Sequence, residues 1–200
     1  MTIPEIPERL ETERLIIRSP RLEDISAIYT SVRESLAELS PWMAWATPEY
    51  SLAGCEENTR SAIAEFITRQ NLRYHFHDRD TDEHIGCSGL HRIDWNVPKF
   101  EIGYWCRTSR TGQGYVTETV EALTNLALED FGAARVEIQC DDKNVRSAGV
   151  AERCGYGLEG VLKNHSRGVD GSLRDTRIYA VTQNIQRREK GRTSSAPLSN

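Results

Sequence analysis

The chain has 200 residues and a formal net charge of -5. A length of this order predicts one domain with a substantial apolar core. The acidic balance argues against a nucleic-acid-binding surface, which normally carries a basic face. No apolar run approaches the ~20 residues that a membrane-spanning helix needs. We therefore expect a cytoplasmic protein that binds neither nucleic acid nor membrane.

The cysteines and histidines indicate neither a disulfide framework nor a metal site. The five cysteines are scattered without a CxxC pair: Cys55, Cys87, Cys106, Cys140 and Cys154. An odd number does not suit a set of paired cysteines, and we expect small buried side chains instead. His75 and His77 are strand neighbours without cysteines beside them, so we expect no metal site.

Hydrophobic spacing predicts helices and strands in mixed order along the chain. The predicted elements are a strand at 14–18, a helix at 22–39, a helix at 55–67, strands at 73–78, 84–93 and 100–106, a helix at 116–127, a strand at 135–140, a short helix at 147–154, and strands at 158–163 and 173–181. Gly155 suits the end of the short helix because glycine accepts the left-handed backbone. Residues 183–200 are polar and mixed in charge, which predicts a disordered tail after a single domain at 1–182.

A glycine-containing turn separates the strand at 100–106 from the following helix. Gly112 and Gly114 free the backbone before a helix N-terminus, where unpaired N–H groups and the helix dipole favour an anion. No third glycine follows at the Rossmann spacing, and no Gly-Lys-Ser/Thr ends the turn. The turn predicts a phosphate-bearing ligand other than NAD or ATP, and a tight turn without a ligand is the alternative.

The order of these elements resembles the GCN5-related N-acetyltransferases (GNAT), in particular the branch that acetylates ribosomal-protein N-termini. The matching segments include Thr12-Glu13-Arg14-Leu15, Pro41-Trp42-Met43-Ala44-Trp45, Glu101-Ile102-Gly103-Tyr104-Trp105, Gly112-Gln113-Gly114-Tyr115, Asn144-Val145-Arg146-Ser147 and Arg153-Cys154-Gly155-Tyr156. The resemblance covers roughly Thr12 to Val181. It implies an α/β (α+β) fold: a mixed central sheet with two splayed parallel strands, flanked by helices.

The resemblance implies acetyl-CoA as the cofactor. Its pyrophosphate would lie on the backbone N–H groups of the glycine turn, and its pantetheine arm would follow the edge of the strand that ends at Cys106. Asn144 matches a position whose side chain contacts the pantetheine, and a helix N-cap is the alternative role. The expected contacts are Tyr104, Trp105, Cys106, Arg107, Arg110, Thr111, Gly112, Gln113, Gly114, Tyr115, Val116, Thr117, Asn144 and Ser147.

The departing thiolate needs a hydrogen-bond donor. Many relatives place a tyrosine where this chain has Ala151, so the resemblance does not supply that acid here. The ribosomal branch uses a serine at the position of Ser147, which implies a hydrogen bond to the developing thiolate. The alternative is that Ser147 only starts a helix.

The attacking amine must lose a proton. An α-amine with a pKa of ~7.8 is roughly 15% neutral at pH 7, whereas a lysine is neutral only about 0.04% of the time. Glu101 and Glu137 are the candidate bases, each on the less apolar face of a central strand and each able to act through a water. A strand carboxylate paired with an arginine is the alternative for each.

We expect the acceptor site around Trp42, Trp45, His91 and Trp95, because aromatic walls with a few polar groups suit a flexible peptide end. The resemblance implies an N-acetyltransferase that acts on the N-terminus of a protein, most readily a ribosomal protein. A small-molecule amine, such as an antibiotic or an aminoacyl nucleotide, is the alternative acceptor. A non-catalytic acetyl-CoA sensor is the alternative from another class. A homodimer is compatible with these observations.

Overall fold

Eight strands form one mixed sheet in the order β1-β2-β3-β4-β5-β6-β8-β7. The computed structural model describes residues 3–183. The strands are β1 (Arg9–Glu11), β2 (Leu15–Arg18), β3 (Leu72–Asp78), β4 (His84–Asp94), β5 (Lys99–Cys106), β6 (Arg135–Asp141), β7 (Gly157–Arg167) and β8 (Leu173–Thr182). Only β5 and β6 pair in parallel among the described strands.

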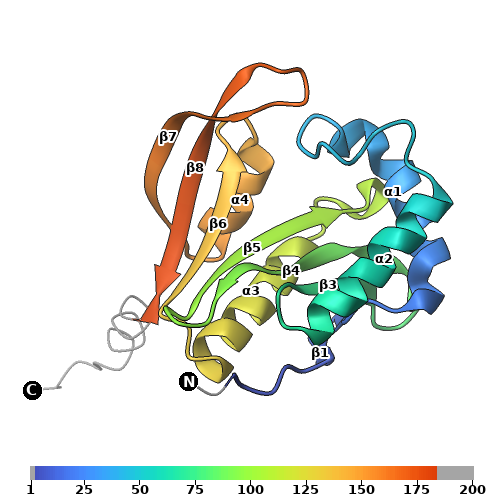
Figure 1. Ribbon diagram of the computed structural model, residues 1–200, viewed down its shortest axis with the longest axis horizontal. Helices are drawn as coiled ribbons and strands as arrows, with labels where there is room; N and C mark the ends of the chain where they lie inside the picture. Colours follow the sequence, from blue (N-terminus) through green and yellow to red (C-terminus); the bar gives the residue numbers. More distant parts are fainter. Residues whose placement is uncertain (1–2, 184–200) are drawn as a thin grey trace, which may run out of the picture.

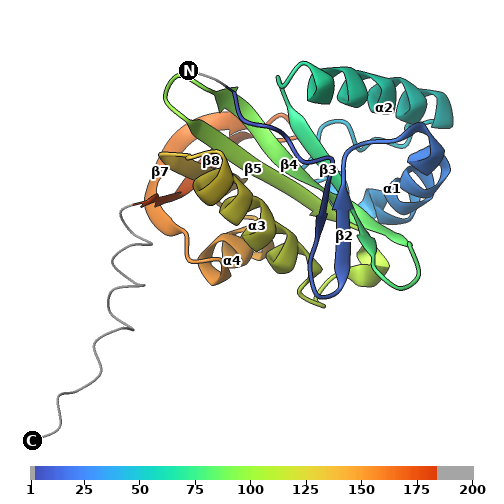
Figure 2. The same ribbon diagram turned by 90° about the horizontal axis from the view of Figure 1, so that it is seen from below.

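Helices cover both faces of the sheet. The α-helices are α1 (Ile25–Leu39), α2 (Leu52–Ile67), α3 (Tyr115–Asn125) and α4 (Val145–Arg153). Short 3-10 turns lie at Leu22–Asp24 and Thr108–Arg110, and a π-helical turn at Leu126–Asp130 continues α3. Figure 2 shows α1 and α2 on one side of the sheet and α3 and α4 on the other. None of the described helices has the length and apolarity required to cross a membrane.

The core follows from the alternation in the central strands. Phe100 and Ile102 of β5, and Val136 and Ile138 of β6, are almost fully buried and belong to one apolar cluster. Leu123 of α3 joins the same cluster, because its helix places one apolar stripe against the sheet. Alternate residues of the strands and one face of α3 therefore contribute apolar side chains to the same buried layer.

The two parallel strands separate soon after they begin. β5 and β6 pair only at Lys99 with Arg135, Phe100 with Val136 and Glu101 with Glu137. Figure 1 shows β6 turning away from β5 beyond this point. The remaining edge of β5 faces a wedge rather than a neighbouring strand, so its backbone groups are available to a ligand.

The observed elements confirm the predicted fold class and most of the predicted elements. Strand β1 was not predicted, because three residues carry too little periodicity to mark a strand. Helix α4 begins at Val145, two residues earlier than expected, because Asn144 caps it. Of the tail predicted at 183–200, only Gln183 is described, and its side chain donates to the Leu128 carbonyl at 3.4 Å; the rest lies outside the described residues.

A buried polar cluster lies between α1 and strands β2 to β4. Arg18 donates to Asp24 at 2.7 Å and to Asp82 at 2.6 Å. His75 Nδ1 lies 2.9 Å from His84 Nε2, and His84 Nδ1 lies 2.9 Å from Ser31 Oγ. Burial lowers the pKa of His75 to about 3 and lowers the pKa of His84 well below its ordinary value, so both imidazoles are neutral.

These histidines predict that the protein loses stability in mild acid. The unfolded chain protonates histidine near pH 6.5, whereas the fold keeps His75 and His84 neutral, so the unfolded state binds more protons below that pH. The free energy of unfolding should fall by about 2 kcal/mol for each such histidine between pH 7 and pH 5. Urea unfolding at the two pH values measures this. Replacing the exposed His165 (His165→Gln) should not alter the effect, and a stability equal at both pH values would contradict it.

Candidate active site

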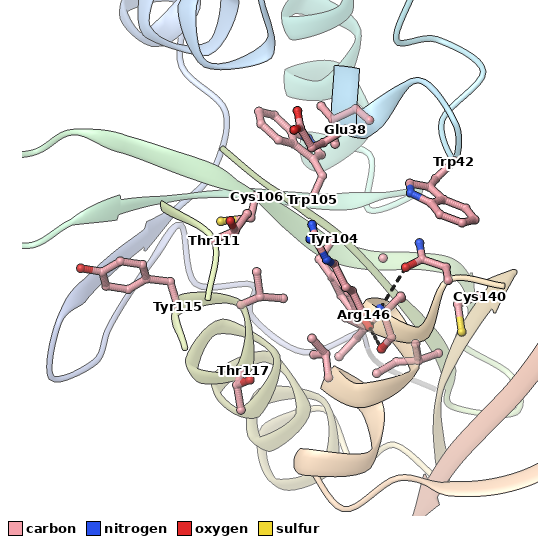
Figure 3. Close-up of a pocket in the computed structure, with 18 of the residues that line it drawn as sticks. Glu38, Trp42, Tyr104, Trp105, Cys106, Thr111, Tyr115, Thr117, Cys140 and Arg146 are labelled. Atoms are coloured by element: carbon pink, nitrogen blue, oxygen red, sulfur yellow. Dashed lines mark hydrogen bonds between the residues drawn. The ribbon is translucent and has the colours of Figure 1, made fainter. Parts of the chain in front are cut away.

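The wedge between β5 and β6 opens into a cavity of about 780 Å³. Its lining comes from α1 and the segment after it, the edge of β5, the glycine turn, β6 and α4. Figure 3 shows Trp42 and Arg146 at one part of this cavity and Tyr115 and Thr117 at another, with Tyr104 between them. The cavity therefore joins the glycine turn to the open strand edge.

The glycine turn has the backbone geometry that its sequence predicts. Gly112 and Gly114 adopt φ values of 74° and 85°, in the left-handed region. Gly114 is the N-cap of α3. Within the described residues, no hydrogen bond occupies the backbone N–H groups of residues 112–117. These groups form an array of donors at a helix N-terminus, which suits a phosphate.

Arg14 holds the turn in place from the other end of the chain. Its guanidinium donates to the carbonyl of Gln113 at 2.9 Å and to Glu118 at 2.8 Å, and it lies 4.6 Å from the ring centroid of Tyr115. The backbone N–H of Arg14 also donates to Glu118 at 3.0 Å. Sequence analysis missed this role because the partners are about a hundred residues apart.

Two arginines near the turn are already paired with carboxylates. Arg107 contacts Glu34 at 2.6 Å and Glu83 at 2.7 Å, and Arg110 is also bonded to Glu83. Glu34 in addition accepts the backbone N–H of Ser109 at 3.0 Å. The carboxylates offset much of the positive charge that the sequence places here. Backbone N–H groups thus remain the main donors for an anion.

Tyr104, Asn144 and Ser147 form a hydrogen-bonded group across the wedge. The Tyr104 hydroxyl donates to the Ser147 carbonyl at 2.9 Å, and its oxygen lies 3.0 Å from Ser147 Oγ. Because the single phenol proton goes to the carbonyl, the Ser147 hydroxyl is the donor in the second contact. Burial raises the pKa of Tyr104, so the phenol stays protonated. Asn144 accepts the backbone N–H of Ser147 at 3.1 Å and caps α4, the alternative role that its position predicted.

The two candidate bases lie at the closed end of the wedge. Glu101 and Glu137 face each other across the parallel pair, and neither lines a described cavity. Glu101 lies 3.3 Å from Arg92, and Arg135 donates to Glu137 at 2.8 Å. Burial raises the pKa of Glu101, against the opposing effect of Arg92. Each carboxylate could reach the wedge only through a water.

A second cavity of about 280 Å³ adjoins the first on the side of α1 and α2. Both cavities are lined by Met43, Gly103, Tyr104 and Trp105, so they meet at the edge of β5. The Trp45 ring packs against Trp105, with 6.2 Å between ring centroids.

The structure brings together most, but not all, of the expected site residues. Those that line the large cavity are Trp42, Tyr104, Trp105, Cys106, Arg110, Thr111, Gly112, Gly114, Tyr115, Val116, Thr117, Asn144 and Ser147. Trp45 and His91 line the second cavity. Gln113 and Arg107 lie outside both, although they belong to the same turn. Trp95 packs against Phe100 and Phe131, with centroids at 5.2 and 5.9 Å, because the end of β4 carries it away from the wedge.

The described residues contain no group of three or more His, Cys, Asp or Glu side chains arranged to hold a metal ion. The acetyltransferase (GNAT) domain family matches residues 14–157. This match spans the glycine turn, both splayed strands and α4. The chain belongs to the GNAT acetyltransferase family. As a GNAT enzyme it is an N-acetyltransferase, and acetyl-CoA is its acetyl donor.

Two kinds of relative resemble this GNAT chain. It is 32% identical to a ribosomal-protein-serine acetyltransferase of Escherichia coli K12, over 62% of this chain and 70% of that protein. Its fold is similar to the α-N-acetyltransferase RimL in complex with coenzyme A, with a TM-score of 0.82, 23% identity, and 88% and 98% of the two chains covered. A microcin self-immunity acetyltransferase, solved with acetyl-CoA and AMP, has a TM-score of 0.81, 22% identity, and coverage of 88% and 97%.

The glycine turn of this GNAT enzyme predicts a specific defect in acetyl-CoA binding. Gly114→Asp should weaken binding at least tenfold, because the substitution strains a left-handed residue and sets a carboxylate against the pyrophosphate. Calorimetric titration with acetyl-CoA measures the affinity. Gly132→Asp is the matched control, since Gly132 also has a positive φ of 66° but has open space around it. Equal affinities of Gly114→Asp and wild type would contradict the prediction.

Proposed function

We propose that this GNAT enzyme acetylates the N-terminal α-amine of a protein, with a ribosomal protein as the leading candidate. The observation that carries the proposal is the junction of the two cavities at Gly103 and Trp105. There the open edge of β5 meets an aromatic-walled pocket. An extended peptide end can enter such a pocket and bring its amine to the strand edge. The relative that acetylates a ribosomal-protein serine supports the same acceptor class.

The glycine turn and the β5 edge fit the acetyl donor, which supplies the acetyl group as a thioester. The backbone N–H groups of residues 112–117 would hold the pyrophosphate, because they have no other partner within the described chain. The backbone of Tyr104 to Cys106 would hold the pantetheine arm as a neighbouring strand would, since β6 has turned away there. The side-chain amide of Asn144 lies on the facing wall and retains its two N–H donors.

An N-terminal α-amine needs little help from this site to lose its proton. An N-terminal α-amine with a pKa of ~7.8 is already roughly 15% neutral at pH 7. Glu101 or Glu137 would take the remaining proton through a water. Burial raises the pKa of Glu101, which suits this carboxylate to accept a proton. Their arginine partners would hold the carboxylates in place at the closed end of the wedge.

The hydroxyl of Ser147 would stabilise the departing sulfur through a hydrogen bond. It lies in the wall of the large cavity and has a proton to donate. Rotation of the hydroxyl about its Cβ–Oγ bond would turn that proton from Tyr104 toward the thiolate. The Tyr104 phenol supports the serine from behind and keeps its bond to the Ser147 carbonyl. This pair would take the place of the tyrosine that other relatives carry at the position of Ala151.

A small-molecule amine is the second candidate acceptor. The microcin self-immunity acetyltransferase, with a similar fold, was solved with AMP and acetyl-CoA. A cavity of about 280 Å³ is also of a size that suits a small molecule.

An acceptor panel tests the proposed function. Thiol release from acetyl-CoA is followed with Ser-, Ala- and Met-initiated peptides, polyamines and amino-bearing antibiotics. We expect faster turnover with the Ser-initiated peptides than with any free amine. Preference for a small amine would instead favour the second candidate. If the protein binds acetyl-CoA but none of the acceptors leads to thiol release, both candidate functions are contradicted.

We expect replacement of Ser147 to lower kcat without changing the affinity for acetyl-CoA. Ser147→Ala should lower kcat by about ten- to a hundredfold because the donor to the thiolate is lost. The affinity for acetyl-CoA should stay the same, since the helix cap uses the backbone N–H of Ser147. Tyr104→Phe should give a smaller loss of kcat, because it removes only the supporting hydroxyl. Steady-state kinetics and calorimetry separate the two effects, and equal losses in both would indicate a binding role instead.

A further inference from the structure

The second cavity contains no carboxylate. Its polar lining consists of one arginine, two histidines, the amide of Asn58 and several hydroxyl or thiol groups. Its aromatic walls are Trp45, Tyr50 and Trp105. A pocket built for a polycationic amine would carry acidic side chains to pair with the additional charges. The charge of this pocket therefore disfavours polyamine-like acceptors.

Arg73 of β3 supplies the positive charge of the pocket. Its guanidinium donates to the side chain of Asn58, and within the described residues no carboxylate lies at ion-pair distance from it. Arg107 and Arg110, close to the other cavity, are by contrast both paired with Glu83. A half-buried guanidinium without an anion is an incomplete arrangement, because partial burial removes water that would solvate the charge.

The two histidines that line the second cavity are neutral and add no positive charge to that of Arg73. Burial, together with the positive charges of Arg73 and Arg92, lowers the pKa of His91 to about 4, so the imidazole is neutral at pH 7. Burial likewise lowers the pKa of His75 to about 3. Arg73 is thus the only cation that lines the second cavity in the described structure.

The hydrogen bonds of His91 define which nitrogen faces the junction of the two cavities. Asn71 donates its amide to Glu65 at 3.1 Å, so its carbonyl oxygen faces His91 Nδ1 at 2.6 Å. Nδ1 must therefore carry the proton, which leaves Nε2 as an acceptor. Nε2 lies beside Gly103, since a Cβ added there would be 3.4 Å from it. An acceptor amine at the β5 edge can donate an N–H to this nitrogen.

We propose that the acceptor carries a negatively charged group close to its amine, and that Arg73 binds this group as a specificity-determining residue. The amine would lie at the junction near His91 and Gly103, and the anion would lie deeper, against Arg73. Two sources share this chemistry: a protein N-terminus with an acidic side chain next to it, and a small acceptor with its own carboxylate. The inference rests on the proposed acetyl transfer to an amine.

Matched acceptor pairs test the inference without changing the amine. The protein arm compares Ser-Glu-Gly-Gly-amide with Ser-Gln-Gly-Gly-amide and Ser-Lys-Gly-Gly-amide. The small-molecule arm compares Ser-Gly, which has a free carboxylate, with Ser-Gly-amide. In at least one arm the acidic member should have a KM lower by about tenfold, because a charge-assisted hydrogen bond replaces a neutral contact. The arm with the larger ratio identifies the source of the anion.

Variants of Arg73 separate its charge from its packing. Arg73→Gln should abolish the preference for the acidic member, with little change in kcat for the neutral peptide or in acetyl-CoA affinity. Arg73→Lys should restore part of the preference, because it keeps the positive charge. Arg60→Gln is the matched control. It removes one positive charge from an exposed position on α2 and should leave the preference intact. Thermal unfolding checks that each variant is folded.

Direct binding keeps this test separate from the proposed function. The acidic and neutral peptides, and Ser-Gly with its amide, are titrated calorimetrically into protein saturated with coenzyme A. Tighter binding of an acidic member, lost in Arg73→Gln, would support the inference even if no thiol were released, while the proposed acetyl transfer would fail. Equal affinities and equal KM values within both pairs would overturn the inference, even with rapid acetyl transfer. A preference that survives in Arg73→Gln would overturn the role of Arg73.

Discussion

The separation of β5 from β6 after three residue pairs is the constraint on which the rest of the structure depends. A strand edge in the middle of a sheet normally bonds to its neighbour, and here it is open beyond the third residue pair. The sheet tolerates the break because each strand keeps its other partner: β4 pairs along β5, and β8 pairs along the full length of β6. A cavity therefore forms between two halves in which β5 and β6 each keep a hydrogen-bonded neighbour.

Ion pairs hold the glycine turn of this cavity in position, and the backbone N–H groups of the turn are the groups available to a ligand. Arg14 and Glu118 fasten the glycine turn to the N-terminal strands, while Glu34 and Glu83 hold the arginines just before it. These charged side chains beside the turn are thus paired with one another. The turn presents N–H groups at fixed positions, and an anion there would meet an arrangement that needs little rearrangement on binding.

Local sequence patterns predicted most of the helices and strands. Contacts between segments distant in the sequence determined several side-chain roles that these patterns did not predict. The positive φ of Gly112 and Gly114 follows from their own chemistry, so the turn was recognisable from the sequence. The Arg14 contact joins distant segments, and no local signal marks it. Trp95 was predicted as an acceptor contact from its residue type, yet it directly follows β4 and packs against Phe131. The arginine partners of Glu101 and Glu137 were foreseen only as an alternative.

The contact between Tyr104 and Ser147 has a mechanical meaning. It crosses the wedge and joins β5 to α4, and so links the two halves of the sheet at a point beyond their three shared residue pairs. The two halves of the sheet are thus connected both by the residue pairs at 99–101 and by this hydrogen bond. A ligand bound between these points would contact both halves and stabilise their separation. After its departure, this hydrogen bond and the contact between Thr124 and Tyr156 at 2.6 Å would still connect the two halves, so the width of the opening would depend on both.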